Sequence, residues 1–334
     1  GEAKRERRIM SLEFYLFDVN HGQSAAVKLP NGAWCLFDAG ACAELSPTDF
    51  IRRIEGYPFR PSLTTAIQRP PFSYLKTTIS HLHGDHVADW EKVFGTGPSF
   101  LRTVDYDRDY VEDALATSSD ESKQTILDFC TKGASGFSPT AAVPNYGGAS
   151  IYELSLPVTV ARALGGTQNS RVNNASVVTR ISCHGHSILI CGDMEAEAWD
   201  FVLNRWVDYA AWRQLVSRVD VLVAPHHGHS SAYSVDLMAL ANPGVVLVSA
   251  RSGDDSVESR YSQIQGIVIG SDPYKMISTR QKGSIKITVN PGQTLLGPPA
   301  VFWNFDVDGR RAESERQLKA LFSGQFWRPL AGNT

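Results

Sequence analysis

Short apolar runs separated by turn residues fill the first forty positions of the chain. "LEFYLFDV", "SAAVKL" and "AWCLFDAG" are rich in strand-forming residues, and Asn-His-Gly and Pro-Asn-Gly lie between them. Runs of this kind are typical of strands, and short turns containing Gly connect antiparallel neighbours. The pattern predicts that the protein begins with an antiparallel meander.

The next apolar run leads directly into a cluster of polar side chains. "LKTTIS" predicts a strand that ends at residue 80, immediately before "HLHGDH". Beyond the cluster, the spacing of Val87, Trp90 and Val93 predicts a helix that begins near residue 85 or 86. The cluster is therefore expected where a strand ends and a helix begins.

Two later strands also end in polar side chains. "ASVVTRISCHGHSILICGD" predicts a hairpin whose second strand ends at Asp193. Residues 219–224 predict a buried strand that Pro225 ends just before two adjacent histidines. Open α/β sheets usually build their sites at the carboxyl ends of strands, so we expect these segments to meet at one edge.

The remaining segments are predicted as follows. We expect a helix over 109–131, a helix over 235–240, a strand at "GVVLVSA", a hairpin at "MISTRQKGSIKITV" and a helix near 313–322. The interpretation gives residues 1–10 as a disordered head or a non-native remnant, 11–298 as one hydrolase domain with an insertion or lid at about 98–170, and 299–334 as a C-terminal helical extension.

Composition narrows the class of protein. With 43% apolar and 20% charged residues over 334 positions, the chain has the make-up of a globular enzyme. A net charge of −3 excludes a global positive field for nucleic acid or membrane and leaves room for a local basic groove. The five cysteines lack a C-x-x-C pair, and no apolar run approaches the roughly 18 residues of a membrane span. We expect a cytoplasmic protein that does not bind membranes.

Eight of the nine histidines fall into three clusters, at 81/83/86, 184/186 and 226/227/229. Imidazole and carboxylate ligands without thiolate favour a reactive zinc, manganese or iron site over a closed structural one. The candidate ligands are more than one ion needs: His81, His83, Asp85, His86, Asp193 and one of the paired histidines. This number is typical of two metal ions that share a bridging carboxylate.

These motifs resemble those of the metallo-β-lactamase superfamily. H-x-H-x-D-H at 81–86, the earlier "FDAG", the later "CGD" and the terminal "PHHG" carry the likeness, which covers most of residues 12–290. "FDVNHGQS", "NNASVVTRI", "ILICGDME" and "VDVLVAPHHGHSS", in that order, are similar to a stand-alone form of the ComEC-like metallo-hydrolase domain. The resemblance implies an α/β fold, an αββα sandwich of two mixed β-sheets flanked by helices.

The resemblance also implies a role for each ligand. His81 and His83 would hold the first of two divalent ions, Zn or Mn; Asp85, His86 and His227 would hold the second, and Asp193 would bridge. Asp85 and His226 are assigned as catalytic, with His226 binding phosphate or acting as the acid, by analogy with a related phosphorylcholine esterase. The superfamily's isolated ligand histidine is missing, so water, Asn173 or Asn174 is expected to complete the first site.

Further polar residues have alternative interpretations. His21 either lines the site or closes a turn, and Asp38 is expected to support the site by hydrogen bonds rather than bind metal. His229 is a surface or supporting residue, and His184 and His186 are expected in an exposed turn. Lys282 could contact phosphate, although scattered basic residues are usually solvated.

The resulting hypothesis is a dinuclear metal-dependent hydrolase. We expect a phosphodiesterase or nuclease that cleaves a nucleotide, cyclic nucleotide or oligonucleotide/DNA by attack of a metal-bridged hydroxide. Its substrate would be a phosphate-containing small molecule or nucleic acid, and no protein partner is indicated. The alternatives are hydrolysis of a lactone, thioester or phosphocholine ester, and a non-catalytic metal-stabilised scaffold.

Overall fold

The protein is described by a computed structural model over residues 11–56, 72–133, 144–251, 255–269, 272–279, 283–292 and 300–302. The strands are β1 Leu12–Leu16, β2 Ala25–Lys28, β3 Trp34–Phe37, β4 Lys76–Thr78, β5 Phe100–Arg102, β6 Ser150–Leu154, β7 Val178–Cys183, β8 His186–Ile190, β9 Val221–Val223, β10 Val245–Val248, β11 Ile267–Ile269, β12 Asp272–Tyr274, β13 Met276–Ser278, β14 Ser284–Val289 and β15 Ala300–Phe302. The α-helices are α1 Pro47–Ile54, α2 Gly84–Val87, α3 Trp90–Gly95, α4 Arg108–Ala116, α5 Asp120–Asp128, α6 Val158–Ala163, α7 Gln168–Asn173, α8 Ala196–Asn204, α9 Tyr209–Val216 and α10 Val235–Ala241.

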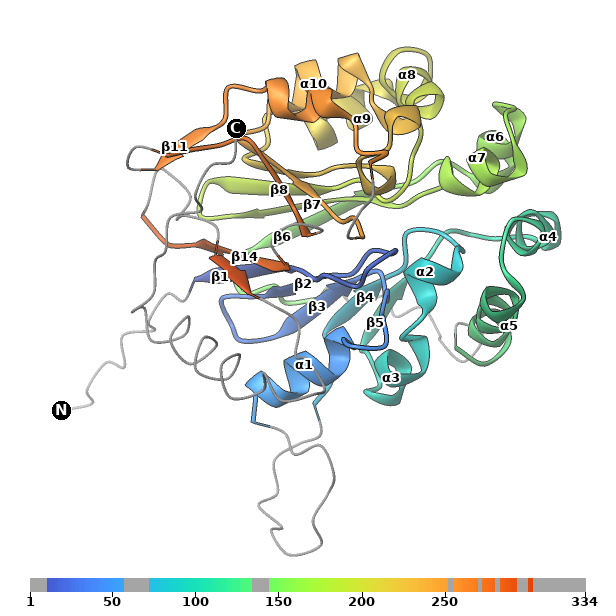
Figure 1. Cartoon of the computed structure of the whole chain (residues 1–334), viewed down its shortest axis with the longest axis horizontal. Coiled ribbons are helices and arrows are strands. Elements are labelled where there is room, and N and C mark those ends of the chain that lie inside the picture. Colours follow the sequence, from blue (N-terminus) through green and yellow to red (C-terminus); the bar gives the residue numbers. More distant parts are fainter. Residues whose placement is uncertain are drawn as a thin grey trace, which may run out of the picture.

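Two mixed sheets form the body of the protein. The strand orders are β15-β14-β1-β2-β3-β4-β5 and β13-β10-β9-β8-β7-β6, and a two-stranded sheet joins β11 to β12. The predicted meander is confirmed, because β1, β2 and β3 pair antiparallel. Figure 1 shows the two sheets face to face, with α8, α9 and α10 over one outer face and α1 and α3 over the other. The predicted αββα sandwich is the observed fold.

The strands are apolar on both faces because each sheet lies between two apolar layers. Along β1, Phe14 and Leu16 join the cluster between the sheets, and Tyr15 joins the cluster beneath the outer helices. In β9 the same alternation places Val221 between the sheets and Leu222 under the helices. Burying each such aliphatic or aromatic side chain contributes about 1.5–3 kcal/mol. This core forms the rigid frame on which the candidate site is built.

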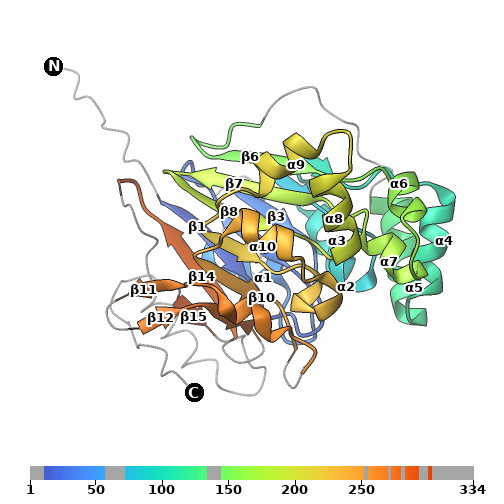
Figure 2. The ribbon, with the colours of Figure 1, turned by 90° about the horizontal axis from the view of Figure 1, so that it is seen from above.

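The polar segments lie together at one edge of the sandwich. Residues 81–86 follow β4, Asp193 follows β8, and the paired histidines at 226 and 227 follow β9. In Figure 1, α2 lies at this edge between the two sheets, and Figure 2 shows α4, α5, α6 and α7 gathered at the same end. The expected meeting of the strand ends is therefore present in the structure.

The region between residues 98 and 170 differs in detail from the predicted insertion. It supplies an edge strand to each sheet, β5 and β6. Only its helices, which lie between these strands and after β6 in the chain, are additions to the two-sheet sandwich. The predicted helix over 109–131 is divided into α4, α5 and a π-helical turn, Phe129–Gly133. The division has a local cause, because the Ser119 side chain accepts a hydrogen bond from the Ser122 amide and caps a new helix.

The segment "MISTRQKGSIKITV" is not the predicted hairpin. Strand β13 pairs parallel with β10, whereas β14 pairs antiparallel with β1 in the other sheet. Ile277 and Ile285 both enter the apolar layer between the sheets. The alternation of apolar residues thus correctly predicted two strands. However, β13 and β14 belong to opposite sheets, and each buries apolar side chains in the layer between them.

Some predictions fall outside the described residues. The charged head at 1–10, most of the C-terminal extension at 299–334, the expected helix near 313–322 and Lys282 belong to this group. Within the described part of the chain, every helix is too short or too polar to cross a lipid bilayer.

A charged pair ties the two sheets together beside the apolar layer. Lys76 Nζ on β4 lies 2.6 Å from Glu153 Oε2 on β6, and the side chains are 12% and 9% exposed. Glu153 Oε1 also accepts a hydrogen bond from Thr78 Oγ1 at 2.6 Å. The two carboxylate oxygens of one residue thus join β6 to β4.

We expect Glu153→Leu to lower the free energy of unfolding by about 3 kcal/mol, because Lys76 would keep its charge without a partner. The double variant Lys76→Met/Glu153→Leu should recover most of this loss, since an apolar pair needs no compensating charge. Urea unfolding of the four proteins in this double-mutant cycle measures both effects. A double variant that is no more stable than Glu153→Leu would contradict the assignment.

Candidate metal centre

The backbone after β4 turns sharply to present the first cluster. His83 occupies the position before α2 in an extended conformation, and the short helix then carries Asp85 and His86. Gly22 passes so close that a β-carbon there would lie 2.7 Å from the carbonyl oxygen of Asp85, at a φ of +149°. The turn at residues 20–22 therefore packs directly against the backbone of the cluster.

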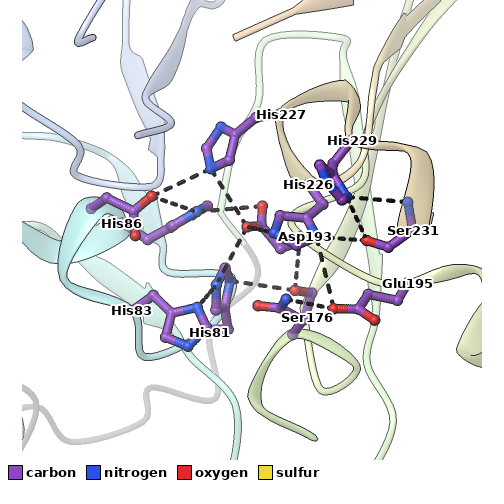
Figure 3. A network of polar contacts seen from close by, with 12 residues as sticks. His81, His83, His86, Ser176, Asp193, Glu195, His226, His227, His229 and Ser231 are labelled. Atoms are coloured by element: carbon purple, nitrogen blue, oxygen red, sulfur yellow. Dashed lines mark hydrogen bonds and ion pairs between the residues drawn. The ribbon is translucent and has the colours of Figure 1, made fainter. Parts of the chain in front are cut away.

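Asp193 reaches the cluster by an equally close approach. Gly192 precedes it with a φ of +57°, and a β-carbon at this position would lie 2.8 Å from the Ser176 β-carbon. The Asp193 amide donates to Ser176 Oγ at 3.0 Å. Figure 3 shows Asp193 between His227 and the pair His81 and His83.

The first group of donors is the pair of histidines at 81 and 83, with Asp193 nearby. His81 Nε2 lies 3.0 Å from His83 Nδ1 and 3.9 Å from Asp193 Oδ2. Two nitrogens bound to one zinc ion at about 2.1 Å in tetrahedral geometry lie about 3.4 Å apart. The ring nitrogens are thus close to the spacing that one ion requires.

The second group contains Asp85, His86 and His227 and again shares Asp193. His227 Nε2 lies 3.3 Å from Asp85 Oδ2 and 3.5 Å from Asp193 Oδ2. His86 Nε2 lies 3.4 Å from Asp193 Oδ1. The sets His81, His86, Asp193 and Asp85, His86, His227 each bring their ligand atoms within 4.8 Å of one another.

Three buried atoms of this centre have no hydrogen-bond partner in the part of the chain that the structure describes. They are His86 Nε2, His227 Nε2 and Asp193 Oδ1. A buried polar group without a partner costs about 1–3 kcal/mol, so three such atoms facing each other indicate a missing ligand. Imidazole nitrogen and carboxylate oxygen suit Zn²⁺ or Mn²⁺. The residues present therefore fit a divalent metal centre.

Hydrogen bonds at the outer nitrogens leave the inner nitrogens free for metal. His86 Nδ1 donates to Asp38 Oδ2 at 2.9 Å, and His227 Nδ1 donates to the Ser249 carbonyl oxygen at 3.1 Å. His81 Nδ1 lies 3.0 Å from Ser80 Oγ, whose hydrogen goes to Asp38 Oδ2. Each ring is held in the tautomer that directs its Nε2 lone pair into the centre.

His83 follows the same rule with the opposite nitrogen. Its Nε2 lies 3.4 Å from Thr117 Oγ1 at the end of α4, and this hydroxyl donates to the Asp113 carbonyl oxygen at 3.1 Å. The hydroxyl can therefore only accept from His83 Nε2, which leaves Nδ1 as the free nitrogen. Helix α4 thus contributes directly to the orientation of a candidate ligand.

Three residues of the centre have strained backbone. Asp38, His226 and His227 have φ values of 59°, 50° and 54°, in the left-handed region that non-glycine residues rarely adopt. Such conformations cost about 1–3 kcal/mol each and persist where the surrounding structure holds them. The His226 amide is held by the Gly192 carbonyl oxygen at 3.0 Å. The strain turns both imidazoles toward Asp193.

His226 lies beside the two ligand groups and is more accessible. Its Nε2 is 4.0 Å from Asp193 Oδ2, its Nδ1 is 3.8 Å from Glu195 Oε1, and 22% of the side chain is exposed. Ser231 Oγ lies 3.3 Å from the same Nδ1 and also contacts His229 Nδ1 at 2.9 Å. The geometry favours His227 as the ligand of the pair and leaves His226 beside the centre.

Opposing charges set the protonation of the two central histidines. Burial opposes charge on His86, but the carboxylates of Asp193, Asp38 and Asp85 outweigh it and raise the pKa of His86 well above its usual value. Burial is likewise outweighed at His227, where Asp193 and Asp85 raise the pKa. In the metal-free protein these two imidazoles hold protons more tightly than a solvated histidine.

The remaining charges follow from the same cluster. Burial lowers the pKa of His81, and burial lowers the pKa of His83 to about 4. Burial would raise the pKa of Asp193 and of Asp85, but the nearby positive charge of His86 reverses this effect and lowers both. In the metal-free centre the carboxylates thus favour protons on His86 and His227, and a metal ion would have to displace them.

The residues predicted to support the centre differ in exposure and in the side chains that they contact. His21 lines the centre: its Nε2 is 3.8 Å from Asp85 Oδ2, and 65% of the side chain is exposed. Asp38 makes hydrogen bonds to Ser80 and His86, as expected of a support. Asn173 and Asn174 are fully buried and bond to the side chains of Glu195 and Glu197.

Only one of the two histidines expected in an exposed turn lies in the turn, and it is half-buried. His184 lies in the turn between β7 and β8, at a φ of 51°. His186 is instead on β8, only 6% exposed, with Nδ1 3.1 Å from Asp220 Oδ1. The prediction for His186 was wrong because Asp220, distant in sequence, provides a partner that makes burial of the ring possible.

Several residues of the centre were not predicted from the sequence. Ser80, Ser176 and Thr117 orient the ligand histidines, and Glu195 faces His226. Serine and threonine are common in loops, so their type alone gives no signal. Glu195 could have been noticed, because it stands two residues after Asp193 at the start of a helix.

Comparisons with known proteins show distant likenesses. No family model matches the chain. Uncharacterized protein YcaI of Escherichia coli (strain K12) is 34% identical over 128 residues, which are 36% of this chain and 15% of that protein. The chain thus matches less than a sixth of the length of this curated relative.

Solved structures resemble this chain distantly, at low sequence identity. The metallo-beta-lactamase fold protein YhfI from Bacillus subtilis is 12% identical, with a TM-score of 0.36 over 72% of this chain and 86% of that one. Zn(2+)-bound PqqB from Methylobacterium extorquens is 15% identical, with a TM-score of 0.35 over 63% and 71%. CmlA, a diiron beta-hydroxylase from Streptomyces venezuelae, is 15% identical, with a TM-score of 0.36 over 79% and 47%. Likenesses this distant assign no reaction.

We expect metal binding to release protons near pH 7. The ion must displace the protons that the raised pKa values of His86 and His227 retain, so apparent affinity should increase as the pH rises through those values. Calorimetric titration of Zn²⁺ into metal-free protein, in buffers of different ionisation enthalpy, counts the protons. The control variant His184→Ala should release the same number. Heats that do not depend on the buffer would rule out this protonation state.

Proposed function

We propose that this protein is a metal-dependent hydrolase of the metallo-β-lactamase superfamily that cleaves phosphodiester bonds. The observation that carries the proposal is the set of buried, unpartnered atoms on His86, His227 and Asp193, which face one another beside accessible imidazoles. The substrate class is a nucleotide, cyclic nucleotide or oligonucleotide. Retention of two ions, Zn or Mn, is part of the same proposal.

The residues divide into holding and reacting groups. Bound here, two divalent cations would activate water and withdraw charge from a substrate oxygen. Asp193 is the shared holding group, because its Oδ1 lies 3.4 Å from His86 Nε2 and its Oδ2 lies 3.5 Å from His227 Nε2. Asp85, 3.3 Å from His227 and 22% exposed, is the carboxylate placed to hold an ion and to orient water.

His226 is the group placed to move a proton. Its Nδ1 is 3.3 Å from Ser231 Oγ and 3.8 Å from Glu195 Oε1, which leaves Nε2 directed toward Asp193. As an imidazolium, a partly exposed ring at this position can donate its Nε2 proton to the leaving oxygen of a substrate held at the centre and then regain a proton from water. Because Glu195 and Ser231 both contact Nδ1, the ring orientation is set before substrate arrives.

Exposed side chains beside the centre favour an anionic substrate. His21 is exposed beside Asp85, and its ring lies 5.3 Å from that of His227. Burial lowers the pKa of His21, Asp85 opposes this effect, and the positive charges of His227 and Arg251 add to it. Arg251 thus supplies positive charge beside the centre, and His21, whose neutral form is favoured, supplies a ring N–H donor. The overall charge of −3 favours a small substrate over a long polymer.

Asp193→Asn should abolish both metal retention and turnover. The amide keeps the size of the side chain but loses the charge that balances His86 and His227. We would measure hydrolysis of bis(4-nitrophenyl) phosphate by metal-stripped protein resupplied with Mn²⁺ or Zn²⁺, together with metal content by mass spectrometry. The control His184→Ala, in the β7–β8 turn, should match the parent protein.

Other outcomes separate the competing functions. Full activity and two retained ions in Asp193→Asn would refute the proposed centre. Two ions in the parent protein without phosphodiester turnover would redirect the search to lactones, thioesters and phosphocholine esters. Failure with all of these would favour the non-catalytic scaffold.

His226→Gln should retain both ions. It should lose more turnover on substrates whose leaving group needs a proton. General acid catalysis contributes about 10²–10⁴-fold, and nitrophenolate needs little protonation whereas a nucleoside hydroxyl needs much. We therefore expect a loss of about 10²-fold or more on a dinucleotide and a clearly smaller loss on bis(4-nitrophenyl) phosphate. Equal losses on the two substrates would show that His226 binds phosphate rather than donating a proton.

A further inference from the structure

Two adjacent asparagines at the end of α7 are fully buried, but their side chains are satisfied to different extents. Asn174 uses both amide atoms: Nδ2 donates to Glu197 Oε1 at 3.0 Å, and Oδ1 accepts from the Glu195 amide at 3.1 Å. Asn173 uses only one. Its Nδ2 donates to Glu195 Oε1 at 2.9 Å, and its buried Oδ1 has no hydrogen-bond partner among the described residues.

The orientation of the Asn173 amide is determined by its neighbour. An ionised carboxylate can only accept hydrogen bonds, so the group that faces Glu195 must be the Asn173 amino group and not its carbonyl. Glu195 is itself held, because its Oε2 accepts from Ser170 Oγ at 2.9 Å. The amide therefore cannot turn over to satisfy Oδ1 without placing two acceptors against each other.

The turn that follows Asn173 packs against the first group of ligands. The Asn173 carbonyl oxygen accepts from the Ser176 amide at 3.0 Å. Ser176 Oγ in turn lies 3.4 Å from His81 Nδ1 and accepts from the Asp193 amide at 3.0 Å. Figure 3 shows Ser176 and Glu195 on the side of Asp193 where His81 and His226 lie. One short turn thus connects Asn173 to His81 and Asp193.

The chemistry of the unpartnered atom limits its ligand. An amide oxygen accepts hydrogen bonds or binds cations, and it repels the oxygens of a phosphate. Leaving it unsatisfied costs about 1–3 kcal/mol. If His86 belongs to the second ion, His81, His83 and Asp193 offer the first ion three ligand atoms, whereas Asp85, His86, His227 and Asp193 offer the second ion four. A tetrahedral ion at the first position needs one more.

We propose that Asn173 Oδ1 completes the coordination of the ion held by His81 and His83, and that Glu195 is the positioning residue that directs it there. The inference rests on the metal centre of the proposed function, and it does not depend on which bond is cleaved. One carboxylate would then serve both sides of the centre, because Glu195 Oε1 also lies 3.8 Å from His226 Nδ1. Asn174, whose amide is fully used, has no such role.

The test compares metal affinity in two matched variants. Asn173→Ala and Asn174→Ala remove the same atoms from adjacent, equally buried positions. Zn²⁺ affinities would be measured by competition with a chromophoric chelator, and folding by thermal unfolding of the metal-free proteins. We expect Asn173→Ala to bind one of its two ions at least about tenfold more weakly, with the other unchanged. Asn174→Ala should keep both affinities within about threefold of the parent protein, even though it loses two hydrogen bonds.

A second variant keeps the inference testable if Asn173→Ala does not fold. Asn173→Asp combined with Glu195→Gln retains an oxygen at the same position and a hydrogen bond between the two side chains, so this double variant should recover the affinity for the first ion that Asn173→Ala loses. Parental affinity for both ions in Asn173→Ala, or an equal loss in Asn174→Ala, would overturn the inference. So would a double variant Asn173→Asp/Glu195→Gln that folds yet fails to hold the first ion.

The outcomes also separate this inference from the proposed function. Two ions with an Asn173-dependent affinity, in a protein without phosphodiester turnover, would support the ligand and reject the reaction. Turnover with two ions that do not respond to Asn173 would do the opposite. A parent protein that binds no Zn²⁺ would reject both.

Discussion

Burial of ionised carboxylates at the end of an apolar core is the constraint on which this structure depends. Asp193 is 2% exposed and Asp38 is 1% exposed, so neither can be solvated by bulk water. A buried charge is tolerated only where partners compensate it. His86 lies between the two, with Nδ1 2.9 Å from Asp38 and Nε2 3.4 Å from Asp193. The rest of the centre is arranged around this pairing.

The sandwich supplies the rigidity that such a cluster needs. Asp38 ends β3, the histidine cluster follows β4, and Asp193 and His227 follow β8 and β9, so both sheets contribute. The apolar layer between the sheets holds these strand ends in place, and it can therefore maintain left-handed backbone at Asp38, His226 and His227. Strain at these positions is consistent with a centre formed before its ligands arrive.

Sequence patterns predicted the helices and strands better than they predicted which strands and side chains pair with one another. The hairpin ending at Asp193 and the meander of β1 to β3 were predicted, because each depends on neighbouring residues and a short turn. The pairing of β13 with β10 was missed, since it joins strands about thirty residues apart by parallel register. His186 was misplaced for the same reason: its partner Asp220 lies on a different segment.

The sequence alone determined which residues are candidates for the chemistry. Spacing within one short segment was enough to identify His81, His83, Asp85 and His86, because ligands on one turn need little help from the rest of the fold. Only the tertiary structure decided how each ligand is oriented. Which nitrogen of His83 is free, which of His226 and His227 points inward, and which amide oxygen of Asn173 and Asn174 lacks a partner depend on Thr117, Ser249, Glu195 and Glu197. Hydrogen bonds between distant segments form only when the sheets pack, so no local pattern contains them.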